Sequence, residues 1–250
     1  MQKQPHADSW YKATANLQLD FPALQGETCT DVCVIGAGYT GLSTALHLRQ
    51  RGYSVTVLEA NKVGWGASGR NGGHVGTGQR SGQDELEKLV GLDHAKALWQ
   101  LGLEAVDTVC QLIREHQIDC ELKQGNLHVA SKAKECAGLQ AEVEHLQRVY
   151  DYQQISYVDK SELSQLTSGT GFHAGLLDAG SRHLHPLNYA LGLAAAAAGL
   201  GARIHEGSRV LSYSEGDKIR VKTDSGEVQA QYLVLACNGY LEKLEPRAAG

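Results

Sequence analysis

A glycine-rich motif of the form G-x-G-x-x-G is the first feature of the sequence that could do chemistry. Its residues are Gly36, Ala37, Gly38, Tyr39, Thr40 and Gly41. In such a motif the first glycine permits a tight turn, the second lets the backbone approach a pyrophosphate, and the third lets a helix pack closely on a strand. An apolar run precedes the motif and a helical pattern follows it, so the N–H groups of a helix start would face the phosphates. The motif therefore predicts a dinucleotide-binding site.

An acidic residue follows at the distance that this chemistry requires. Glu59 lies 18 positions after Gly41, at the end of the β-branched run SVTVLEA, with Ala60 beside it. A carboxylate at this place accepts hydrogen bonds from ribose hydroxyls and disfavours the 2′-phosphate of NADP. The alternative is a solvated strand end. In the context of the motif, we assign Glu59 and Ala60 to the cofactor site.

A second glycine-rich stretch, GWGASGRNGG at residues 64–73, comes directly after this acid. Its density of glycine excludes a regular helix or strand. A disordered linker is the alternative, but Val63, Trp65 and Val75 are apolar residues that prefer to be buried. A loop rich in N–H groups, with one serine and one arginine, suits a longer diphosphate and a ribityl chain. The second loop therefore favours FAD over NAD.

The elements that would position these motifs can be read from the hydrophobic pattern. DVCVIGAG, from Asp31, is typical of a central parallel strand buried on both faces. A helix over 39–52 and a second strand over 54–60 complete a β-α-β unit. Residues 1–30 form a polar lead-in without a clear period.

Further along the chain we expect a mixed insertion and then a return to helix and strands. Helices are expected over 84–117, interrupted at Gly91 and Gly102, and over 132–150, with a hairpin between them that turns at Gln124-Gly125. A strand, a short helix and a strand follow over 156–178. Pro186 suits the first turn of an alanine-rich helix, and three last strands are joined by turns at 215–217 and 224–226.

Composition limits the class of protein. The 250 residues carry 23 Lys and Arg against 28 Asp and Glu, a net charge of −5 that favours neither nucleic acid nor an anionic membrane. The six cysteines contain no C-x-x-C pair, which favours a reduced, cytoplasmic protein. The start lacks the apolar run of a signal peptide, and the most apolar segment, 189–204, is too short and glycine-broken to span a membrane. EPRAAG follows a strand directly, so we expect a truncated sequence; nothing indicates an oligomeric state.

The motifs together resemble a known family. DVCVIGAGYTGLSTALHL, VTVLEA and GWGASGRNGG are similar to the D-amino-acid-oxidase-like superfamily of FAD-dependent oxidoreductases. WYKATAN, HQIDC and HLHPLNYALG resemble its gamma-glutamylputrescine oxidase group. The resemblance implies an α/β fold: a glutathione-reductase-type FAD-binding Rossmann domain with an interleaved α+β substrate domain, incomplete at the C-terminus. We place the lead-in at 1–30, the FAD-binding domain at 31–82 and 183–250, and a helical and mixed insertion with part of the substrate domain at 83–182.

The resemblance also extends the predicted cofactor site to the second loop and to two later segments. The added residues are Gly66, Ala67, Ser68, Arg70, Asn71, Gly72, Gly73, Val210, Ala236, Asn238 and Gly239. The loop residues would reach toward the flavin ring, Val210 would hold adenine, and Ala236–Gly239 would pass beside the cofactor. Related dehydrogenases carry flavin covalently on a histidine in this region. His74 lies a few positions past that place, which favours non-covalent FAD.

The activity implied by the resemblance is oxidation of an amine C–N bond. The amine, gamma-glutamylputrescine or a related compound, would donate hydride to flavin, the imine would hydrolyse, and O2 would accept the electrons. One alternative is an amino-acid or sarcosine-type flavin dehydrogenase that passes electrons to a quinone. Another is a non-catalytic dinucleotide-binding module. A neutral amine can donate hydride without a general base, so no catalytic residue is assigned.

Several other side chains leave two interpretations open. His183 and His185 could titrate near working pH, but we favour a role in positioning the helix after Pro186 or packing under FAD. A metal site is not expected because no third ligand is near them in sequence. Arg182 could pair with a substrate carboxylate or lie exposed. The remaining candidates are an aromatic lid or a staple at Trp10-Tyr11, and surface histidines at His47 and His116.

Overall fold

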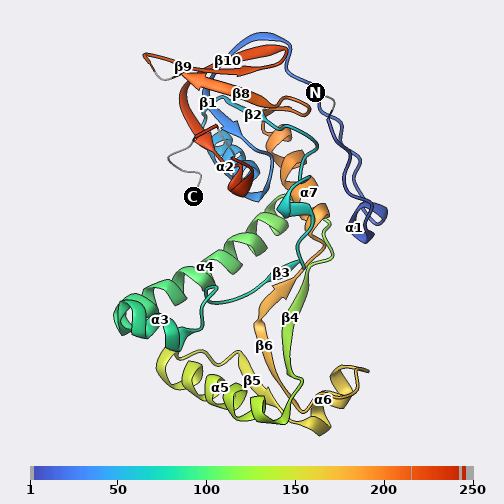
Figure 1. The fold of residues 1–250 in the computed structure, drawn as a ribbon, viewed down its shortest axis with the longest axis vertical. Coiled ribbons are helices and arrows are strands. Elements are labelled where there is room, and N and C mark those ends of the chain that lie inside the picture. The colour runs from blue at the N-terminus through green and yellow to red at the C-terminus, as the bar shows by residue number, and fades with distance from the viewer. Residues whose placement is uncertain (1–2, 215, 242–243, 246–250) are drawn as a thin grey trace. The chain divides into compact units, whose positions relative to one another are not determined.

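The computed structural model describes residues 3–214, 216–241 and 244–245 of the chain. Its backbone divides into two compact units. The first unit contains Met1–Gly72, Ile113–Cys120 and His185–Gly250. The second unit contains Gly73–Leu112 and Glu121–Leu184. Each unit has its own sheet, and Figure 1 shows the elements of both.

The sheet of the first unit has the mixed architecture expected of a Rossmann-type domain. Its strands lie in the order β7-β2-β1-β10-β9-β8. Their bounds are Arg203–His205 for β7, Val55–Leu58 for β2, Gly26–Ile35 for β1, Gly226–Leu235 for β10, Ile219–Thr223 for β9 and Val210–Ser214 for β8. The pairs from β7 to β10 are parallel, and β9 and β8 continue the sheet as antiparallel strands (Figure 1).

Burial explains why the predicted β-α-β unit forms. All four residues of β2 and the last four of β1 are buried, as in a parallel sheet covered on both faces. Between these strands runs α2 (Tyr39–Gln50), which packs against α7 (Pro186–Gly199). Pro186 occupies the first turn of α7, as predicted, where its missing N–H leaves no bond unmade. The first unit also contains the short helices α1 (Trp10–Ala13), η1 (Ala67–Gly69) and η3 (Asn238–Tyr240).

The polar lead-in, placed at residues 1–30 for its lack of a clear period, includes the start of the first strand of the sheet. Strand β1 begins at Gly26, which pairs with Gly226 of β10. Backbone pairing needs no apolar side chain, and the first three residues of this strand are largely exposed. The hydrophobic pattern therefore detects only the buried half of the strand. The predicted turns at 215–217 and 224–226 do separate β8, β9 and β10, although residue 215 lies outside the described residues, as does EPRAAG from residue 246 on.

In the second unit, β6 (Ala174–His183) is the strand that organises the sheet. It pairs with β4 (Lys123–Ala130) along most of its length, with β5 (Ile155–Val158) near its start, and with β3 (His74–Val75) at its end. The helices of this unit are α3 (Gln83–Val90), α4 (Leu92–Glu115), η2 (Ala133–Glu135), α5 (Cys136–Tyr150) and α6 (Lys160–Leu166). The end of α4, from Ile113, belongs to the first unit.

Two predicted features of this unit are corrected. Gln124-Gly125 is not a hairpin turn: the register against β6 shifts between Gln124 and Asn126, so this is an irregularity within one strand, with Gly125 at a φ of +88°. Gly102 does not interrupt a helix either, since α4 runs through it. A Cβ on Gly102 would lie 2.9 Å from the backbone nitrogen of Gly78, so the glycine allows a close approach of two backbones.

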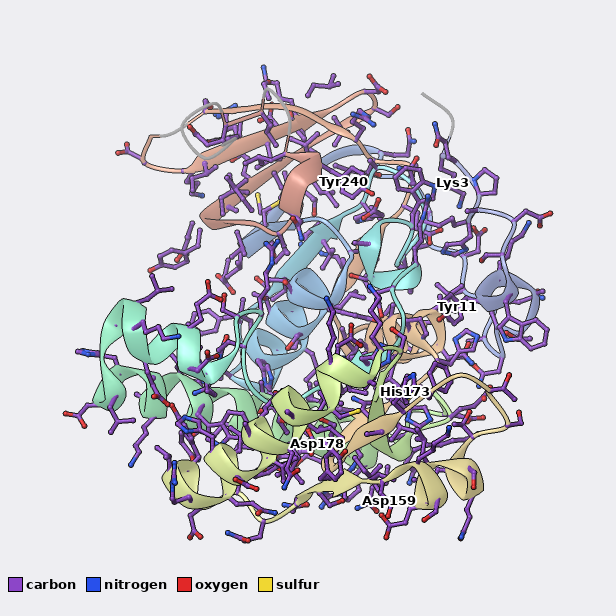
Figure 2. All side chains as sticks on the ribbon, turned by 60° about the horizontal axis from the view of Figure 1, so that its bottom comes forward. Lys3, Tyr11, Asp159, His173, Asp178 and Tyr240 are labelled. Atoms are coloured by element: carbon purple, nitrogen blue, oxygen red, sulfur yellow. The ribbon has the colours of Figure 1, made fainter. Side chains whose placement is uncertain are left out.

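A buried carboxylate, Asp178, binds three parts of the second unit together. Its Oδ2 accepts hydrogen bonds from Thr77 Oγ1 at 2.7 Å and Ser181 Oγ at 2.5 Å. Its Oδ1 accepts from Tyr152 Oη at 2.5 Å and from the backbone nitrogen of Gly180 at 3.0 Å. Figure 2 labels Asp178 on β6. The side chain thereby ties the segment after β3 and the residue Tyr152 to the central strand.

The compact units differ from the predicted domain ranges at three places. The lead-in up to residue 30 belongs to the first unit because its side chains and β1 bond to that unit. Residues 73–82 fall in the second unit, since β3 pairs with β6. Residues 113–120 fall in the first, where Asn16 Nδ2 donates to the carbonyl of Asp119 at 2.8 Å. Among the described residues, no helix is both long and apolar enough to cross a membrane.

Candidate functional site

The glycines of the first motif are required by the backbone geometry around them. Gly36 has a φ of +106°, and a Cβ there would lie 2.6 Å from the carbonyl oxygen of Ala236. A Cβ on Gly38 would lie 2.8 Å from Ser68 Oγ, and one on Gly41 would lie 1.9 Å from the carbonyl oxygen of Gly36. At Gly36 and Gly41 the atom in the way is backbone, which leaves no room for a side chain, whereas at Gly38 it is the hydroxyl of the Ser68 side chain. The motif is thus a tight crossing of strand, turn and helix, as the spacing predicted.

Helix α2 begins inside this motif. Its N-cap is Gly38, which has no side chain to close the first turn. Ser68 Oγ from the second glycine loop accepts a hydrogen bond from the backbone nitrogen of Tyr39 at 3.0 Å. The positive end of the helix dipole therefore lies where the two loops meet. This arrangement favours an anion such as a diphosphate.

Glu59 is bonded to the same turn. Its Oε2 accepts from the backbone nitrogen of Ala37 at 2.9 Å, and its Oε1 accepts from the backbone nitrogen of Asn61 at 2.8 Å. Each carboxylate oxygen can accept a second hydrogen bond, so capacity remains for ribose hydroxyls. Burial raises the pKa of the Glu59 carboxyl above its ordinary value, while the bonds from Ala37 and Asn61 oppose that shift.

A cavity of about 570 Å³ joins these groups within the first unit. Its size is in the range of cofactor pockets. The predicted site residues that line it are Gly36, Ala37, Gly38, Tyr39, Thr40, Glu59, Ala60, Gly66, Ala67, Ser68, Val210, Ala236 and Asn238. They come from the ends of β1, β2 and β10, the start of α2, the second loop and the start of β8. Segments far apart in sequence thus converge on one cavity.

Other predicted site residues are not among those that line the cavity. Gly41 packs against the first turn, as described above. The Arg70 guanidinium lies over the Trp65 ring, 4.4 Å from its centroid, and its Nε donates to the Trp65 carbonyl at 2.7 Å. Asn71 Nδ2 donates to the Ala67 carbonyl at 3.1 Å. These two side chains stabilise the second loop. The other residues that do not line the cavity are Gly72, Gly73 and Gly239, and Gly73 belongs to the second unit.

The cavity also has lining residues that the sequence did not indicate. They are Ile35, Leu58, Asn61, Trp65, Arg209, Leu211, Tyr240, Leu241 and Leu244, whereas Cys237, which also lines it, lies within the predicted segment Ala236–Gly239. Trp65 was singled out as an apolar residue of the loop, and here it meets the Tyr240 ring edge to face at 5.9 Å between centroids. The apolar members have no sequence signal, because an isolated leucine at a strand end looks like any core residue.

The histidines that were considered for chemistry have structural contacts. His185 is the N-cap of α7: its Nδ1 accepts from the backbone nitrogen of Asn188 at 3.1 Å, and its Nε2 lies 3.0 Å from Thr14 Oγ1. The Tyr11 ring packs edge-on against it at 5.1 Å. His185 therefore positions the helix, and Tyr11 acts as a staple, whereas Trp10 is exposed.

In the second unit, His183 Nδ1 lies 2.9 Å from the Gly125 carbonyl. Arg182 donates to the carbonyls of Ala179, Gly180 and Ser181 at its own strand end rather than standing free. His47 lies on α2 beside Gln50. His116 is not simply a surface residue: its Nε2 is buried and has no hydrogen-bond partner among the described residues. Among all the residues that the structure describes, no group of three or more His, Cys, Asp or Glu is arranged to hold a metal ion.

Comparison with known proteins agrees with this geometry. The family described as "FAD dependent oxidoreductase" (DAO) matches residues 31–249. The chain is 38% identical to the gamma-glutamylputrescine oxidoreductase of Escherichia coli over 98% of its own length and 57% of that protein. It is 38% identical to the probable oxidoreductase OrdL of Rhizobium meliloti over 96% of its length and 56% of that protein. The chain therefore spans a little over half the length of these relatives.

Solved structures share the fold. Glycine oxidase from Geobacillus kaustophilus matches with a TM-score of 0.67 at 21% identity, over 83% of this chain and 55% of that one. L-amino acid deaminase from Proteus myxofaciens, in complex with anthranilate, matches with a TM-score of 0.66 at 25% identity, over 89% of this chain and 48% of that one. The predicted α/β architecture with a parallel-stranded, Rossmann-type cofactor domain is confirmed.

Proposed function

Because this chain belongs to the family of FAD-dependent oxidoreductases, we propose that it is the part of an amine-oxidising flavoenzyme that holds FAD in the cavity of the first unit. The observation that carries the proposal is the meeting of Glu59, the start of α2 and both glycine loops around one cavity. A diphosphate, a ribose and an adenine require an anion site, a hydrogen-bond acceptor and an apolar wall. All three are present among these residues.

The residues that would hold the cofactor can be named by chemistry. The backbone of Gly36–Gly38 and the first turn of α2 would hold the diphosphate. Glu59 would accept from the ribose hydroxyls, and Val210 at the start of β8 would contact adenine. The residues Ala236 and Asn238, at the end of β10, would border the cofactor. FAD supplies a hydride acceptor when it is bound.

We retain the assignment of the FAD-binding domain to 31–82 and 183–250, and of part of the substrate domain to 83–182.

The binding of FAD is proposed to be non-covalent. Acid precipitation of the purified protein should leave the flavin in the supernatant. Flavin retained in the precipitate would show a covalent link and contradict this part of the proposal.

The proposed reaction is oxidation of an amine C–N bond, with gamma-glutamylputrescine or a related amine as the substrate and O2 as the acceptor. The likeness to the Escherichia coli enzyme supports the substrate class. No residue of this chain is assigned a proton-transfer step. The role of the described residues is to bind and orient the cofactor and to surround it with apolar side chains such as Leu211 and Leu241.

An absorbance spectrum combined with amine titration tests the proposal. The purified protein should show a flavin spectrum, which should bleach anaerobically with gamma-glutamylputrescine, and hydrogen peroxide should form in air. Bleaching without peroxide would instead indicate a dehydrogenase that passes electrons to another acceptor. A colourless protein that takes up no added FAD would overturn the proposal.

A further inference from the structure

The first residues of the chain lie against the loop that follows Glu59. Four polar contacts join residues 3–6 to this loop and to Glu206. The contacts are Lys3 Nζ to Glu206 Oε2 at 3.2 Å, Gln4 N to Asn61 Oδ1 at 3.1 Å, Trp65 Nε1 to the Pro5 carbonyl at 3.1 Å, and His6 Nε2 to the Val63 carbonyl at 2.8 Å. We call residues 3–6 the strap. A run of bonds from consecutive residues to one loop fixes that loop better than any single contact.

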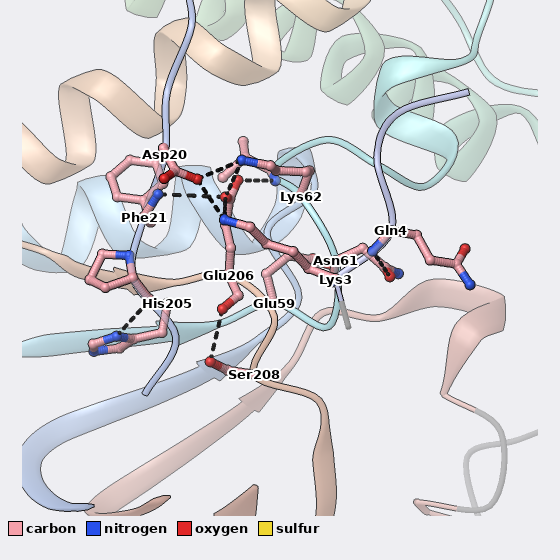
Figure 3. A network of polar contacts seen from close by, with 12 residues as sticks. Lys3, Gln4, Asp20, Phe21, Glu59, Asn61, Lys62, His205, Glu206 and Ser208 are labelled. Carbon is pink, nitrogen blue, oxygen red and sulfur yellow. Dashed lines mark hydrogen bonds and ion pairs between the residues drawn. The ribbon is translucent and has the colours of Figure 1, made fainter. Parts of the chain in front are cut away.

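Glu206 is the residue at which the strap meets the core. Its side chain is only 1% exposed. One carboxylate oxygen, Oε1, accepts from the backbone nitrogen of Val63 at 2.9 Å. The other, Oε2, lies 3.0 Å from Lys62 Nζ and 3.2 Å from Lys3 Nζ (Figure 3). Burying a carboxylate destabilises the folded state unless the group is paired and hydrogen-bonded. The two lysines therefore stabilise Glu206 in its buried position.

Glu206 and Glu59 lie on paired backbones. The backbone nitrogen of Glu59 donates to the His205 carbonyl at 2.8 Å, and the backbone nitrogen of Ser208 donates to the Glu59 carbonyl at 2.8 Å. The backbone nitrogen of Gly207 donates to the Asn61 carbonyl at 3.1 Å. A displacement of the segment around Glu206 is therefore passed to Glu59 (both labelled in Figure 3). Glu59 is one of the residues that line the cavity.

We propose that Lys3 and Glu206 are positioning residues for the cofactor: the strap holds the 59–63 loop through Glu206 and so sets the place of the Glu59 carboxylate. This inference rests on the proposed binding of FAD in this cavity. It adds a role for residues 3–6, none of which the sequence assigned to the cofactor site.

Charge gives the proposal a signature that loss of packing would not produce. Burial is the main cause of the raised pKa of Glu59, and the negative charge of Glu206 raises it further. The other charged or titratable side chains at this place are Lys3, His6, Asp20, Lys62, His205, Arg209 and Cys237. Removing Lys3 leaves Glu206 less compensated and favours protonated Glu59. Removing the charge of Glu206 has the opposite effect.

The test is the pH dependence of FAD affinity. It is measured by titrating the flavin-free protein with FAD at several values between about pH 5 and about pH 9. Lys3→Met should weaken binding roughly tenfold at neutral pH, as expected for loss of a hydrogen bond between charged groups. It should also move the acid-side loss of affinity to higher pH. Glu206→Gln should weaken binding and move that loss to lower pH.

Matched variants complete the experiment. Lys12→Met removes a lysine from outside the strap that forms an ion pair with the exposed Asp8. This variant should leave both the affinity and the profile unchanged. Lys3→Arg should restore both. If Lys3→Met binds FAD with the affinity and the pH dependence of the parent protein, the inference is wrong. It is also wrong if the loss is equal at every pH and the flavin-free protein has a lower melting temperature, which is the mark of a merely structural role. A parent protein that binds no FAD would overturn the proposed function itself.

Discussion

Glu59 Oε2 accepts a hydrogen bond from the backbone nitrogen of Ala37 at 2.9 Å, so the acid that ends β2 is bonded to the turn that ends β1. The two strands are parallel neighbours, with Ile35 opposite Leu58. Their carboxyl ends therefore meet at one edge of the sheet, where ligands of open α/β sheets bind. This bond couples the turn that we propose for the diphosphate to the acid that we propose for the ribose.

Replacing this acid should weaken cofactor binding. In Glu59→Gln one oxygen becomes an N–H₂ donor that faces the backbone nitrogen of Ala37 or Asn61, so an acceptor is lost for both backbone and ribose. We expect FAD affinity to fall by at least about tenfold, since a lost bond to a charged group is worth roughly 1.5–3 kcal/mol. Fluorescence titration of the flavin-free protein measures this. Glu27→Gln, at an exposed position of β1, is the control. Equal affinity in both variants would contradict the assignment of Glu59.

A methyl group on the third glycine of the motif should disrupt the first unit. In Gly41→Ala the new Cβ would meet the Gly36 carbonyl oxygen at 1.9 Å. Overpacking against backbone costs about 1–3 kcal/mol or more, so the melting temperature should fall by several degrees. Gly199→Ala, at the end of α7 with open space around it, should be neutral or slightly stabilising. If Gly41→Ala melts like the parent protein, the tight crossing of strand and helix is wrong.

Replacing the buried carboxylate of the second unit should lower the free energy of unfolding more than replacing an exposed carboxylate does. Asp178→Leu, which has nearly the same shape, removes the acceptor of hydrogen bonds from Thr77 Oγ1, Ser181 Oγ, Tyr152 Oη and the backbone nitrogen of Gly180. Leaving such buried groups unsatisfied costs about 1–3 kcal/mol each, so we expect a loss of about 2–4 kcal/mol in the free energy of unfolding. Asp159→Asn at the N-cap of α6 (Figure 2) should change little, because both residues cap helices well. Urea unfolding distinguishes the two. Similar losses in both variants would contradict the role of Asp178.

Asp20 should give the protein a component of stability that disappears in acid. Hydrogen bonds from Lys3 Nζ at 2.5 Å and Lys62 Nζ at 2.8 Å lower the pKa of this carboxyl from 3.8 to about 2. A lowered pKa in the folded state stabilises the protein above the unfolded value, and the stabilisation is lost as pH falls through the folded value. The difference in unfolding free energy between the parent and Asp20→Asn should be constant above pH 4, about the unfolded pKa, and shrink toward pH 2.

The control for this pH effect removes the cause instead of the carboxyl. In a Lys3→Met/Lys62→Met background, Asp20→Asn should change the pH dependence of unfolding far less. Because Asp20 is 78% exposed, solvent screens these pairs and the whole effect should be small. An undiminished difference in this background would mean that other groups lower the pKa of Asp20.

The sequence by itself determined the centre of the site. The G-x-G-x-x-G spacing, the strand before it and Glu59 beyond it follow local rules: which residues tolerate a positive φ, which runs form buried strands, and where an acid must stand to reach a ribose. Those rules act over a few residues, so Gly36, Glu59 and the start of α2 were predicted correctly as a strand-turn-helix arrangement. The alternating pattern missed the exposed start of β1 for the same reason, because it reports burial rather than pairing.

Only the tertiary structure decided which distant groups meet. Lys3 and Glu206 are separated by 203 positions, and no local pattern marks a lysine at the start of a chain as the partner of a buried carboxylate. The sequence predicts a helix interruption at Gly102, whereas in the structure this glycine allows the backbone of Gly78 to lie against the helix. The side chains around Asp178 likewise come together only because β6 pairs with three other strands. Such contacts depend on how complete elements pack, which a one-dimensional spacing does not encode.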